Sequence, residues 1–452
     1  MKKICIIQRK GIEESPIICE LSALLKQEGN ETYLLIHSYE KNLLSAIKKE
    51  GADIIAIQSE IGDEEWSKKI CMEIRENFPK SKIVSFGSIP TFYQEKSEIP
   101  ADFLVVGEPE VPFLSLINFL EGKEPELINV ISKDSIPTKI QPTDFDLDSL
   151  PMPDREIYYS RYKVLRDFPV KRFLMSRGCV LSCSFCYISG LKNIMGKIKV
   201  RFKSPERVVK EVLQVSEKYP LRFVHFSDDL FPVWNRTWLE KFCKIWKDEI
   251  KLPFSIVTLS NFLNDKVSSS LKEAGCKFVI IGVETYNEKK RIEELEKTSV
   301  TNSIIEGAVN SLSKFGIKAV SINIVGLPGE DIHDWFKTAE FNRKTGISLA
   351  IASEFVPIPK TPLGSLSVSN DKSNIDYVRN IFSLASRSKL FQKISLIFLG
   401  FEPMKFILSR IGEAYLMLKL KSLYEVRFLE GLIYFIRIGR WKDRRANLHQ
   451  IG

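Results

Sequence analysis

The stretch Ser176-Arg-Gly-Cys-Val-Leu-Ser-Cys-Ser-Phe-Cys-Tyr187 carries three cysteines, with intervals of three residues and then two. On a tight loop this spacing can turn Cys179, Cys183 and Cys186 toward one side of an iron–sulfur cluster. Four thiolates would saturate a four-iron cluster, so three leave one iron open to a ligand that is not protein. A zinc site or three buried core cysteines are the alternatives. Structural zinc usually takes a fourth Cys or His, and no His lies nearby.

The composition is that of a large soluble protein. The chain has 452 residues, of which 44% are apolar and 27% charged, and this length has room for two or three domains. The other five cysteines are scattered through apolar or helical patterns, which indicates buried thiols and a reducing cytoplasm. The start, residues 1–8, is too short for a signal peptide, and no apolar run is long enough to predict a membrane-spanning helix.

Short β-rich runs alternate with helix-period segments through residues 1–125. The predicted strands are 4–8, 32–37, 53–58, 82–86 and 103–106, and the predicted helices are 16–29, 41–51, 64–78 and 110–122. This alternation predicts an α/β domain with a doubly wound, mostly parallel sheet. Ligands of such sheets bind beyond the carboxyl ends of the strands, where the loops 8–15, 59–63 and 87–90 lie. Residues 126–165 are predicted to be a linker, because prolines interrupt any regular element there.

The alternation restarts after the linker and predicts a barrel domain over residues 166–370. The predicted strands are 172–176, 222–226, 253–257, 278–283, 319–325 and 350–356, and the predicted helices are 205–218, 238–250, 265–274, 301–315 and 331–345. Six β/α units indicate an open, partial barrel rather than a closed barrel of eight. Active groups are expected at the carboxyl ends of the strands, and the cysteine loop follows the first of them.

The cysteine spacing, with Phe185 before the last cysteine, resembles the radical S-adenosylmethionine (SAM) superfamily. The sheet domain, the segment Ala101-Asp-Phe-Leu-Val-Val-Gly-Glu-Pro-Glu110 and the partial barrel together resemble the members with an N-terminal cobalamin (B12)-binding domain. The resemblance implies a Rossmann-like first domain, a [4Fe–4S] cluster, and SAM bound through its amino and carboxylate groups to the open iron. It also implies cobalamin as a further cofactor.

In the resembling family the cobalamin tail lies against a glycine pair and a hydroxyl side chain. The matching positions here are Gly87-Ser88, one glycine short, and Ser59. The Asp-x-His-x-x-Gly motif that gives cobalt a histidine is absent, so cobalt is expected to have no imidazole ligand from the protein. The alternative is a vestigial Rossmann domain that only covers the barrel.

Further segments match the resembling family in the expected order. Asp228 and Asp229, in His225-Phe-Ser-Asp-Asp-Leu-Phe231, could bind the SAM ammonium, or they could form a surface turn and helix cap. Glu284 is implied to bind the ribose hydroxyls or the amino group. Lys297 is implied to bind the SAM carboxylate, unless it is a solvated lysine at a helix end.

The segment Ile322-Asn-Ile-Val-Gly-Leu-Pro-Gly-Glu330 resembles the family's adenine-binding motif. In that motif Gly326 would permit close approach of the ring and Ile324 would pack on its face. The segment Val356-Pro-Ile-Pro-Lys-Thr-Pro-Leu363 resembles a further motif that follows the sixth strand.

The resemblance implies radical chemistry. One electron from the cluster cleaves SAM, and the deoxyadenosyl radical takes hydrogen from an unactivated carbon. With cobalamin present, C-methylation is the expected outcome, and flavodoxin or ferredoxin is the expected type of reductant. The alternatives are a radical SAM oxidoreductase or cyclase without methyl transfer, and a non-catalytic cluster-bearing sensor or membrane-bound scaffold. The sequence leaves the substrate open among a lipid, a peptide and a small metabolite.

Residues 371–452 carry most of the excess charge, with 15 Lys and Arg against 7 Asp and Glu, so +8 of the total +9. Apolar runs at 394–400, 415–420 and 431–439 predict a helical region, followed by Arg440-Trp-Lys-Asp-Arg-Arg445. Two interpretations stay open: a peripheral contact with the anionic inner membrane surface, and a helical lid on the barrel with a solvated basic rim. Nucleic-acid binding is not expected, because no RNA-binding module is recognised.

Overall fold

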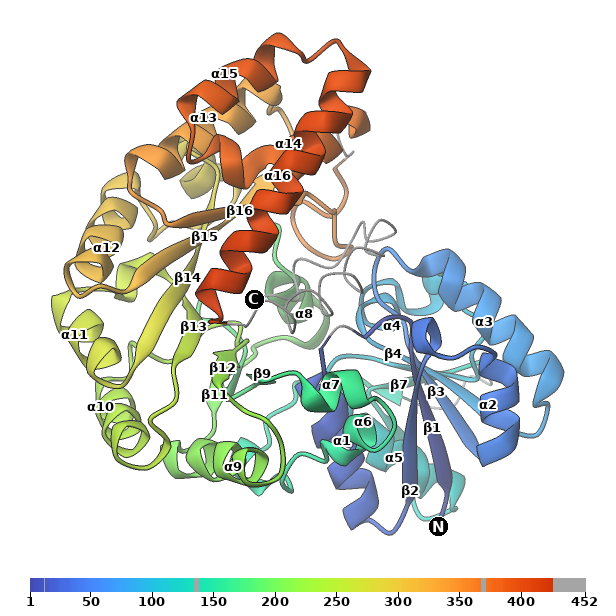
Figure 1. Ribbon diagram of the computed structural model, residues 1–452. Helices are drawn as coiled ribbons and strands as arrows, with labels where there is room; N and C mark the ends of the chain where they lie inside the picture. Colours follow the sequence, from blue (N-terminus) through green and yellow to red (C-terminus); the bar gives the residue numbers. More distant parts are fainter. Residues whose placement is uncertain (12, 134–137, 367–370, 426–452) are drawn as a thin grey trace. The chain divides into compact units, whose positions relative to one another are not determined.

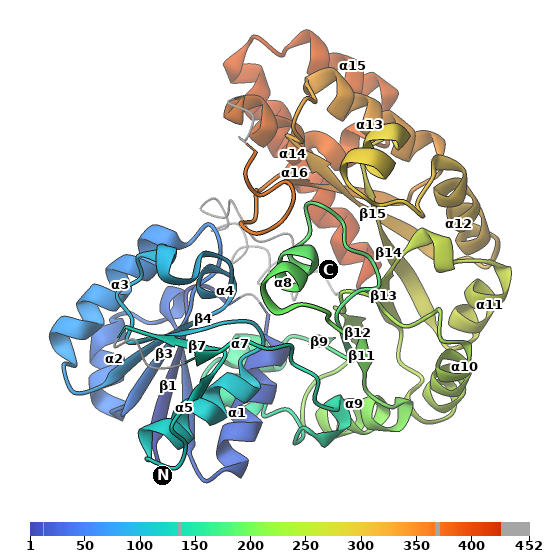
Figure 2. The same ribbon diagram turned by 180° about the vertical axis from the view of Figure 1, so that it is seen from behind.

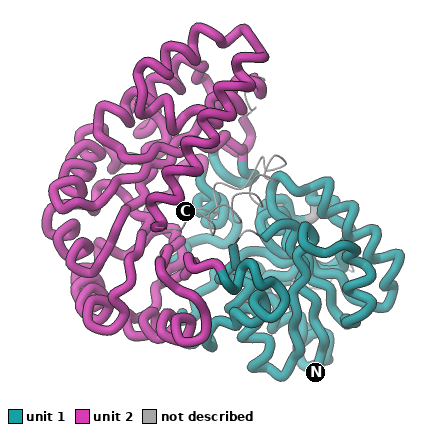
Figure 3. Tube along the Cα trace, in the orientation of Figure 1, with its two compact units in different colours: residues 1–167, 186–201, 358–362 teal, residues 168–185, 202–357, 363–452 magenta. Residues whose placement is uncertain are grey.

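The computed structural model describes residues 1–425 except 12, 134–137 and 367–370. The chain forms two compact units (Figure 3). The N-terminal unit comprises Met1–Asp167, Cys186–Arg201 and Ile358–Pro362, and the barrel unit comprises Phe168–Phe185, Phe202–Pro357 and the residues from Leu363 onward. The chain crosses from one unit to the other within the cysteine loop.

The N-terminal unit is built on a six-stranded sheet in the order β2-β1-β3-β4-β5-β7. The strands are β1 (Lys3–Gln8), β2 (Glu31–Ile36), β3 (Ile54–Gln58), β4 (Lys82–Phe86), β5 (Phe103–Val105) and β7 (Val130–Ser132). The helices are α1 (Pro16–Gln27), α2 (Leu43–Glu50), α3 (Glu64–Asn77), α4 (Ser88–Tyr93) and α5 (Glu110–Leu120). The first five strands are parallel, and β7 runs antiparallel to β5. The predicted doubly wound sheet is confirmed (Figures 1 and 2).

The predicted linker contains more regular structure than its prolines indicate. Besides β7 it forms β6 (Leu127–Ile128), β8 (Thr138–Lys139), α6 (Glu156–Tyr159) and α7 (Lys163–Asp167). Pro125, Pro142, Pro151 and Pro153 lie between these short elements, as the sequence predicts, so the prolines limit the length of each element. A proline ends an element but does not prevent another from beginning a few residues later.

The second half of the linker packs onto the sheet through a buried polar network. The Arg155 guanidinium donates to the Glu14 carboxylate at 2.6 Å, and the Tyr159 hydroxyl donates to the same oxygen at 2.7 Å. The Tyr158 hydroxyl donates to Gln8 at 3.0 Å. Because Gln8 ends β1 and Glu14 lies in the loop that follows it, α6 covers the carboxyl end of β1.

The barrel unit contains six parallel strands in the order β16-β15-β14-β13-β12-β9. They are β9 (Val170–Phe173), β12 (Phe223–Phe226), β13 (Phe254–Thr258), β14 (Cys276–Glu284), β15 (Lys318–Val325) and β16 (Leu349–Glu354). The helices are α9 (Pro205–Lys218), α10 (Arg236–Ile245), α11 (Asp265–Glu273), α12 (Asn302–Lys314) and α13 (Ile332–Lys344). Each strand pairs with the next one along the chain, so the predicted partial barrel of six strands is confirmed.

The alternation of side chains along each strand separates two apolar layers. Val279 and Ile281 of β14 point to the outer layer, where α9–α13 pack, and this layer is the main core of the unit. Phe278 and Ile280 point to the inner, concave face. Figures 1 and 2 show the helices along the outer side of the strands. Successive side chains of such a strand point to opposite faces of the sheet, and they are apolar on both faces because both are buried.

Three helices follow the barrel strands: α14 (Lys372–Ala385), α15 (Lys389–Ile397) and α16 (Glu402–Leu423). The last turns of α16 place Leu416, Leu420 and Leu423 against the inner face of the barrel sheet. This end of α16 therefore packs as the lid interpretation expects (Figure 1). The run 431–439 and the segment 440–445 lie outside the described residues. Within the described residues, no helix is both long and apolar enough to cross a membrane.

Candidate active site

The three cysteines lie on the loop between β10 (Ser176–Arg177) and α8 (Tyr187–Met195). Cys186 is the N-cap residue of α8, so its side chain stands at the amino end of that helix. Cys179 is half-buried, and its sulfur accepts a hydrogen bond from the Leu181 amide at 3.5 Å. All eight cysteines of the chain lie in described segments, and none forms a disulfide.

Cys183 is the buried member of the three. Burial raises the pKa of its thiol to about 11, while the charge of Lys297 works in the opposite direction. In the described part of the chain the three thiols are not drawn together into a metal-binding group. Three thiolates brought close together repel one another, and binding of a cluster would offset this repulsion. Three soft sulfur donors on one loop, with no fourth protein ligand beside them, fit an iron–sulfur cluster with an open iron.

The carboxylates of Asp228 and Asp229 hold the backbone that enters the cysteine loop. Oδ1 of Asp228 accepts hydrogen bonds from the Met175 and Ser176 amides at 2.8 and 2.6 Å. Oδ2 of Asp229 accepts one from the Gly178 amide at 3.0 Å. Asp228 is fully buried, and burial raises the pKa of its carboxyl to about 7. The surface-turn alternative is therefore wrong for Asp228, while binding of the SAM ammonium stays a prediction.

Glu284 and Lys297 form a buried ion pair, with 2.7 Å between Nζ of Lys297 and Oε1 of Glu284. Nζ also donates to the Gly282 carbonyl at 2.8 Å. Both side chains are less than 9% exposed, so the alternative of a solvated lysine is wrong. Burial alone would lower the pKa of Lys297, but the charges of Glu284 and Cys183 and the hydrogen bond to Glu284 together outweigh burial, so this pKa lies above its usual value.

The local backbone of β14 makes this pair possible. The register between β14 and β15 shifts between Gly282 and Glu284, and Glu284 has a left-handed φ of 63°. A Cβ atom at Gly282 would overlap both the Glu284 carboxylate and the Lys297 ammonium. A non-glycine residue in this region of φ stores strain, which is typical of functional sites. The strand end is therefore shaped around two opposite charges that lie within electrostatic reach of Cys183.

An apolar cluster lies at the carboxyl ends of β15 and β16 and unites two of the predicted site residues. Ile324 is buried there with Leu327 and Phe355, and Phe185 of the cysteine loop packs against them. Gly326 has a φ of 83°, and a Cβ atom there would come within 2.9 Å of Ile375 of α14. Contact of Ile324 and Gly326 with adenine stays a prediction.

The three predicted cobalamin residues meet at the ends of β3 and β4. Ser59 is fully buried, and its hydroxyl accepts a hydrogen bond from the Ser85 hydroxyl at 2.9 Å. Gly87 has a φ of 112°, and a Cβ atom there would lie 2.8 Å from the Ser59 carbonyl oxygen and from Oε1 of Glu60. Only glycine fits this position, because Ser59 and Glu60 already occupy the space that a Cβ atom would need; we call Gly87 with these two residues the glycine cradle.

Sequence reasoning missed Glu60, which joins these residues. Its carboxylate accepts hydrogen bonds from the Ser88 amide at 3.2 Å, from the Ser88 hydroxyl, and from Gln58 at 3.0 Å. Burial raises the pKa of Glu60 above its usual value. The only available signal was its position directly after a buried strand, beside Ser59. Because Glu60 lies against Gly87, a ligand that reaches this backbone must displace its carboxyl group or bind it.

The helix that begins after Cys186 packs within the N-terminal unit. A Cβ atom at Gly190 of α8 would come within 2.8 Å of the Phe92 ring of α4 and 3.1 Å of Thr361. A Cβ atom at Gly107, after β5, would overlap the Met195 side chain at the end of α8. Cys186 directly precedes α8, and Gly87 directly precedes α4. These two helices contact each other.

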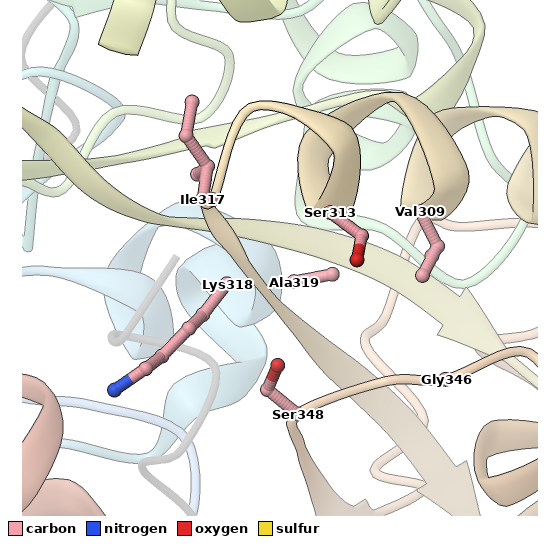
Figure 4. Close-up of a pocket in the computed structure, with 8 residues that line it drawn as sticks. Val309, Ser313, Ile317, Lys318, Ala319, Gly346 and Ser348 are labelled. Carbon is pink, nitrogen blue, oxygen red and sulfur yellow. The ribbon is translucent and has the colours of Figure 1, made fainter.

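A shallow pocket lies elsewhere, lined by Val309, Ser313, Lys318, Gly346 and Ser348 among others (Figure 4). Lys318 begins β15, and Ser348 directly precedes β16. The pocket is thus at the amino ends of the strands, whereas Glu284 and Val325 end their strands at the opposite edge. Barrels of this kind use the carboxyl ends for chemistry, so this pocket is not a candidate for the active site.

The chain is similar to known proteins over much of its length. Residues 173–341 match the family model of the radical SAM superfamily. An uncharacterized methyltransferase of Pyrococcus horikoshii is 28% identical over 342 residues, which cover 73% of this chain and 72% of that protein. The anaerobic magnesium-protoporphyrin IX monomethyl ester cyclase of Cereibacter sphaeroides is 26% identical over 373 residues, covering 76% of this chain and 59% of the cyclase.

Among solved structures, the radical SAM methyltransferase TsrM of Kitasatospora setae, with cobalamin and a [4Fe–4S] cluster bound, superimposes with a TM-score of 0.63. The two chains share 14% identity, and the match covers 80% of this chain and 74% of TsrM. At this identity the likeness shows the fold. Residues 173–341 are therefore similar to the radical SAM superfamily, and over most of the chain the fold resembles that of a radical SAM methyltransferase solved with cobalamin and a [4Fe–4S] cluster bound.

Proposed function

We propose that this protein is a cobalamin-dependent radical SAM enzyme that methylates an unactivated carbon. The observation that carries the proposal is the buried Glu284–Lys297 pair at a barrel strand end, within electrostatic reach of a cysteine of the three-cysteine loop. SAM is an amino acid with one ammonium and one carboxylate group. An ion pair offers one partner of opposite sign to each of these groups.

Cys179, Cys183 and Cys186 are the residues that would hold the [4Fe–4S] cluster. When bound, the cluster supplies the single electron that cleaves SAM. The protein's own residues would position SAM and exclude water from the site. Asp228 and Asp229 fix the backbone at the start of the loop, and Glu284 and Lys297 would orient the charged end of SAM. Phe185 and Ile324 offer an apolar surface for its adenine ring.

The N-terminal unit contributes the residues that would hold cobalamin. Gly87 gives the nucleotide tail access to the backbone, and the Ser59 hydroxyl lies beside it. When bound, cobalamin supplies the methyl group for transfer. Glu60, whose carboxyl group lies beside Gly87 and has a pKa raised by burial, would lie next to the tail. The methyltransferase names of relatives support methyl transfer as the outcome.

A second candidate is a radical SAM cyclase or oxidoreductase without methyl transfer. It is favoured by the relative from Cereibacter sphaeroides, which is named a cyclase and matches 76% of this chain. Both candidates use the same cysteine loop and the same ion pair. They differ in whether the N-terminal unit must hold cobalamin for the reaction to proceed.

The test is reconstitution of the full chain under anaerobic conditions with iron, sulfide and cobalamin. With SAM and a reductant of the flavodoxin or ferredoxin type, we expect about four iron atoms and one cobalt atom per chain, and release of 5′-deoxyadenosine. Label from methyl-labelled SAM should enter a component of a cell extract. Methyl labelling that is absent while SAM cleavage persists without cobalt would favour the cyclase. Absence of both iron and SAM cleavage would contradict both candidates.

A further inference from the structure

Exposed apolar side chains concentrate on the two helices that end the described chain. The described residues contain 13 large apolar side chains that are exposed, and seven of them lie between 390 and 418. These seven, which we call the α15–α16 surface, are Leu390, Ile397, Phe401, Phe406, Ile407, Ile411 and Leu418. Single exposed apolar residues are ordinary, but seven of them between residues 390 and 418 are a concentration that favours an interaction surface.

The packing of α16 explains why this surface faces outward. A Cβ atom at Gly412 would lie 2.5 Å from the Asn380 carbonyl oxygen, so α16 meets the α14 backbone at this point. Leu408 and Leu423 are buried on the same side. Ile407, Ile411 and Leu418 repeat at helical spacing on another face, and they are 48%, 47% and 63% exposed. No described element covers that face.

The charges around the surface have one predominant sign. Residues 387–421 contain seven Lys and Arg against two Asp and Glu. Of the two acidic residues, Glu413 pairs with Arg410 at 3.0 Å and Glu402 pairs with Lys405 at 2.9 Å. Lys389 and Lys393 are exposed beside Leu390 and Ile397 on α15. Residues 426–452 add six Lys and Arg against two Asp and Glu.

We propose that the α15–α16 surface binds the face of an anionic lipid bilayer. An apolar face surrounded by basic side chains is the pattern of helices that lie in the interface of such membranes. A second copy of this chain is a poorer partner. A twofold dimer would bring the same basic surface against itself, and like charges would repel. This proposal concerns location and does not depend on which radical reaction the barrel performs.

The experiment measures sedimentation of the full-length protein with vesicles of phosphatidylglycerol and phosphatidylcholine, and with vesicles of phosphatidylcholine alone. We expect binding to the anionic vesicles at low salt and loss of binding as salt rises, because screening removes the charge attraction. Neutralising Lys389, Lys393 and Lys419 as K389Q, K393Q and K419Q should lower the partition coefficient roughly 100-fold, since each basic residue contributes roughly fivefold.

A second variant tests the apolar part: Ile407→Gln, Ile411→Gln and Leu418→Gln. These side chains are about half exposed, so the fold should tolerate the changes while vesicle binding falls at least tenfold. The matched controls are Ile17→Gln with Met72→Gln, which are exposed apolar residues elsewhere, and Lys48→Gln with Lys49→Gln. Both controls should bind vesicles as the unchanged protein does. Circular dichroism and SAM cleavage verify that each variant is folded.

Three results would overturn the proposal. The first is failure of the full-length protein to bind anionic vesicles at low salt. The second is normal binding by both α15–α16 variants, with binding lost only when residues 426–452 are deleted, which would assign the contact to that segment alone. The third is a dimer in solution that the Ile407, Ile411 and Leu418 changes convert to a monomer, without vesicle binding by either form. Intact SAM cleavage in all of these cases would leave the proposed chemistry unaffected.

Discussion

The two parallel sheets of this protein present different chemistry at their carboxyl ends. The barrel sheet ends in buried charged side chains, namely Asp228 beside the cysteine loop and Glu284 paired with Lys297. The N-terminal sheet ends in small residues, with Gly87 and the buried Ser59 next to a single carboxyl group, Glu60. Both sheets follow the same β/α rule, so topology alone does not set this difference.

This difference indicates which kind of ligand the carboxyl ends of each sheet would bind. Buried charges are tolerated only when paired, and Glu284 and Lys297 meet this condition by pairing with each other; under the proposed function they would also bind the two charged groups of SAM. The glycine cradle has one carboxyl group, Glu60, and no paired cation among the described residues, and under the proposed function its backbone would lie against the cobalamin tail. The predictions that follow test this contrast, beginning with the residues whose loss should have the largest effect.

Replacement of Cys179, Cys183 or Cys186 by Ala should abolish cluster binding and SAM cleavage. Each change removes one of only three sulfur donors on the loop, and a cluster with two protein ligands is not retained. Iron content and 5′-deoxyadenosine release by the anaerobic protein are the measurements. Cys243→Ala is the matched control, because this buried cysteine belongs to the helix layer of the barrel, and it should keep both. Full SAM cleavage in a triple Cys variant would refute the assignment.

Breaking the Glu284–Lys297 pair should affect both stability and SAM affinity. Lys297→Met leaves a buried carboxylate without its partner, which costs about 3–5 kcal/mol of unfolding free energy. Adding Glu284→Gln should recover most of that stability, while the KM for SAM stays at least tenfold raised in both variants. Denaturant unfolding and SAM titration measure the two effects separately.

Lys203→Met is the matched control for the pair. Lys203 and Glu211 also form a buried ion pair, 2.8 Å apart and at most 5% exposed, but they belong to the packing of α9. The change should lower stability without raising the KM for SAM. If Lys203→Met and Lys297→Met have the same effect on SAM, the pair at β14 is structural and the contrast between the two sheets loses its main support.

Much of the fold followed from local pattern in the sequence. The bounds of α9, 205–218, agree with the prediction because Ser204 caps its N-terminus, Pro205 occupies the first turn, and valines repeat with helical periodicity on its buried face. The bounds of strand β4, 82–86, also agree with the prediction, because a short β-rich run spans the same residues. By contrast, α4 was not predicted, since its six residues Ser88–Tyr93 are too few to show a period.

The site was less predictable, because its roles depend on contacts between distant residues. The order of motifs placed Glu284 and Lys297 in one site, but nothing local to Lys297 indicated that it is buried against Gly282 and Glu284. Asp228 was recognised as a strand-end carboxylate, yet its bonds to the Met175 and Ser176 amides span more than 50 residues of sequence. Helix and strand periods carry no information about such pairs.

Gly87→Ala should lower cobalamin binding at least tenfold and leave SAM cleavage unchanged. The new Cβ atom would fill the cradle beside the Ser59 carbonyl oxygen and Glu60. Gly29→Ala is the matched control, since Gly29 also has a positive φ, 79°, but has no neighbour within 4 Å of the added carbon. It carries the same kind of backbone strain without blocking a cradle. Equal loss of cobalt in both variants would attribute the effect to strain and not to the cradle.

Asp228→Asn should change the pH dependence of stability. The carboxyl of Asp228 has an ordinary pKa of 3.8, and burial raises it to about 7 in the folded chain. Between these two values the folded protein holds a proton that the unfolded chain has released. Stability therefore falls as pH rises from about 4 to about 7, and above this range the loss is complete. Asparagine keeps an oxygen that accepts from the Met175 and Ser176 amides and never ionises.

The asparagine variant should accordingly be more stable than the unchanged protein at pH 8, by about 1–3 kcal/mol, and the two should converge below about pH 4. Urea unfolding at several pH values measures this, with the exposed Asp248→Asn as the matched control that should follow the unchanged protein. The same variant separates two roles for Asp228. If this residue only holds the cysteine loop, iron content and the KM for SAM stay as they are, because the accepting oxygen is retained. A tenfold rise in the KM at unchanged iron content would instead show that its charge binds the SAM ammonium, as the sequence motif predicts.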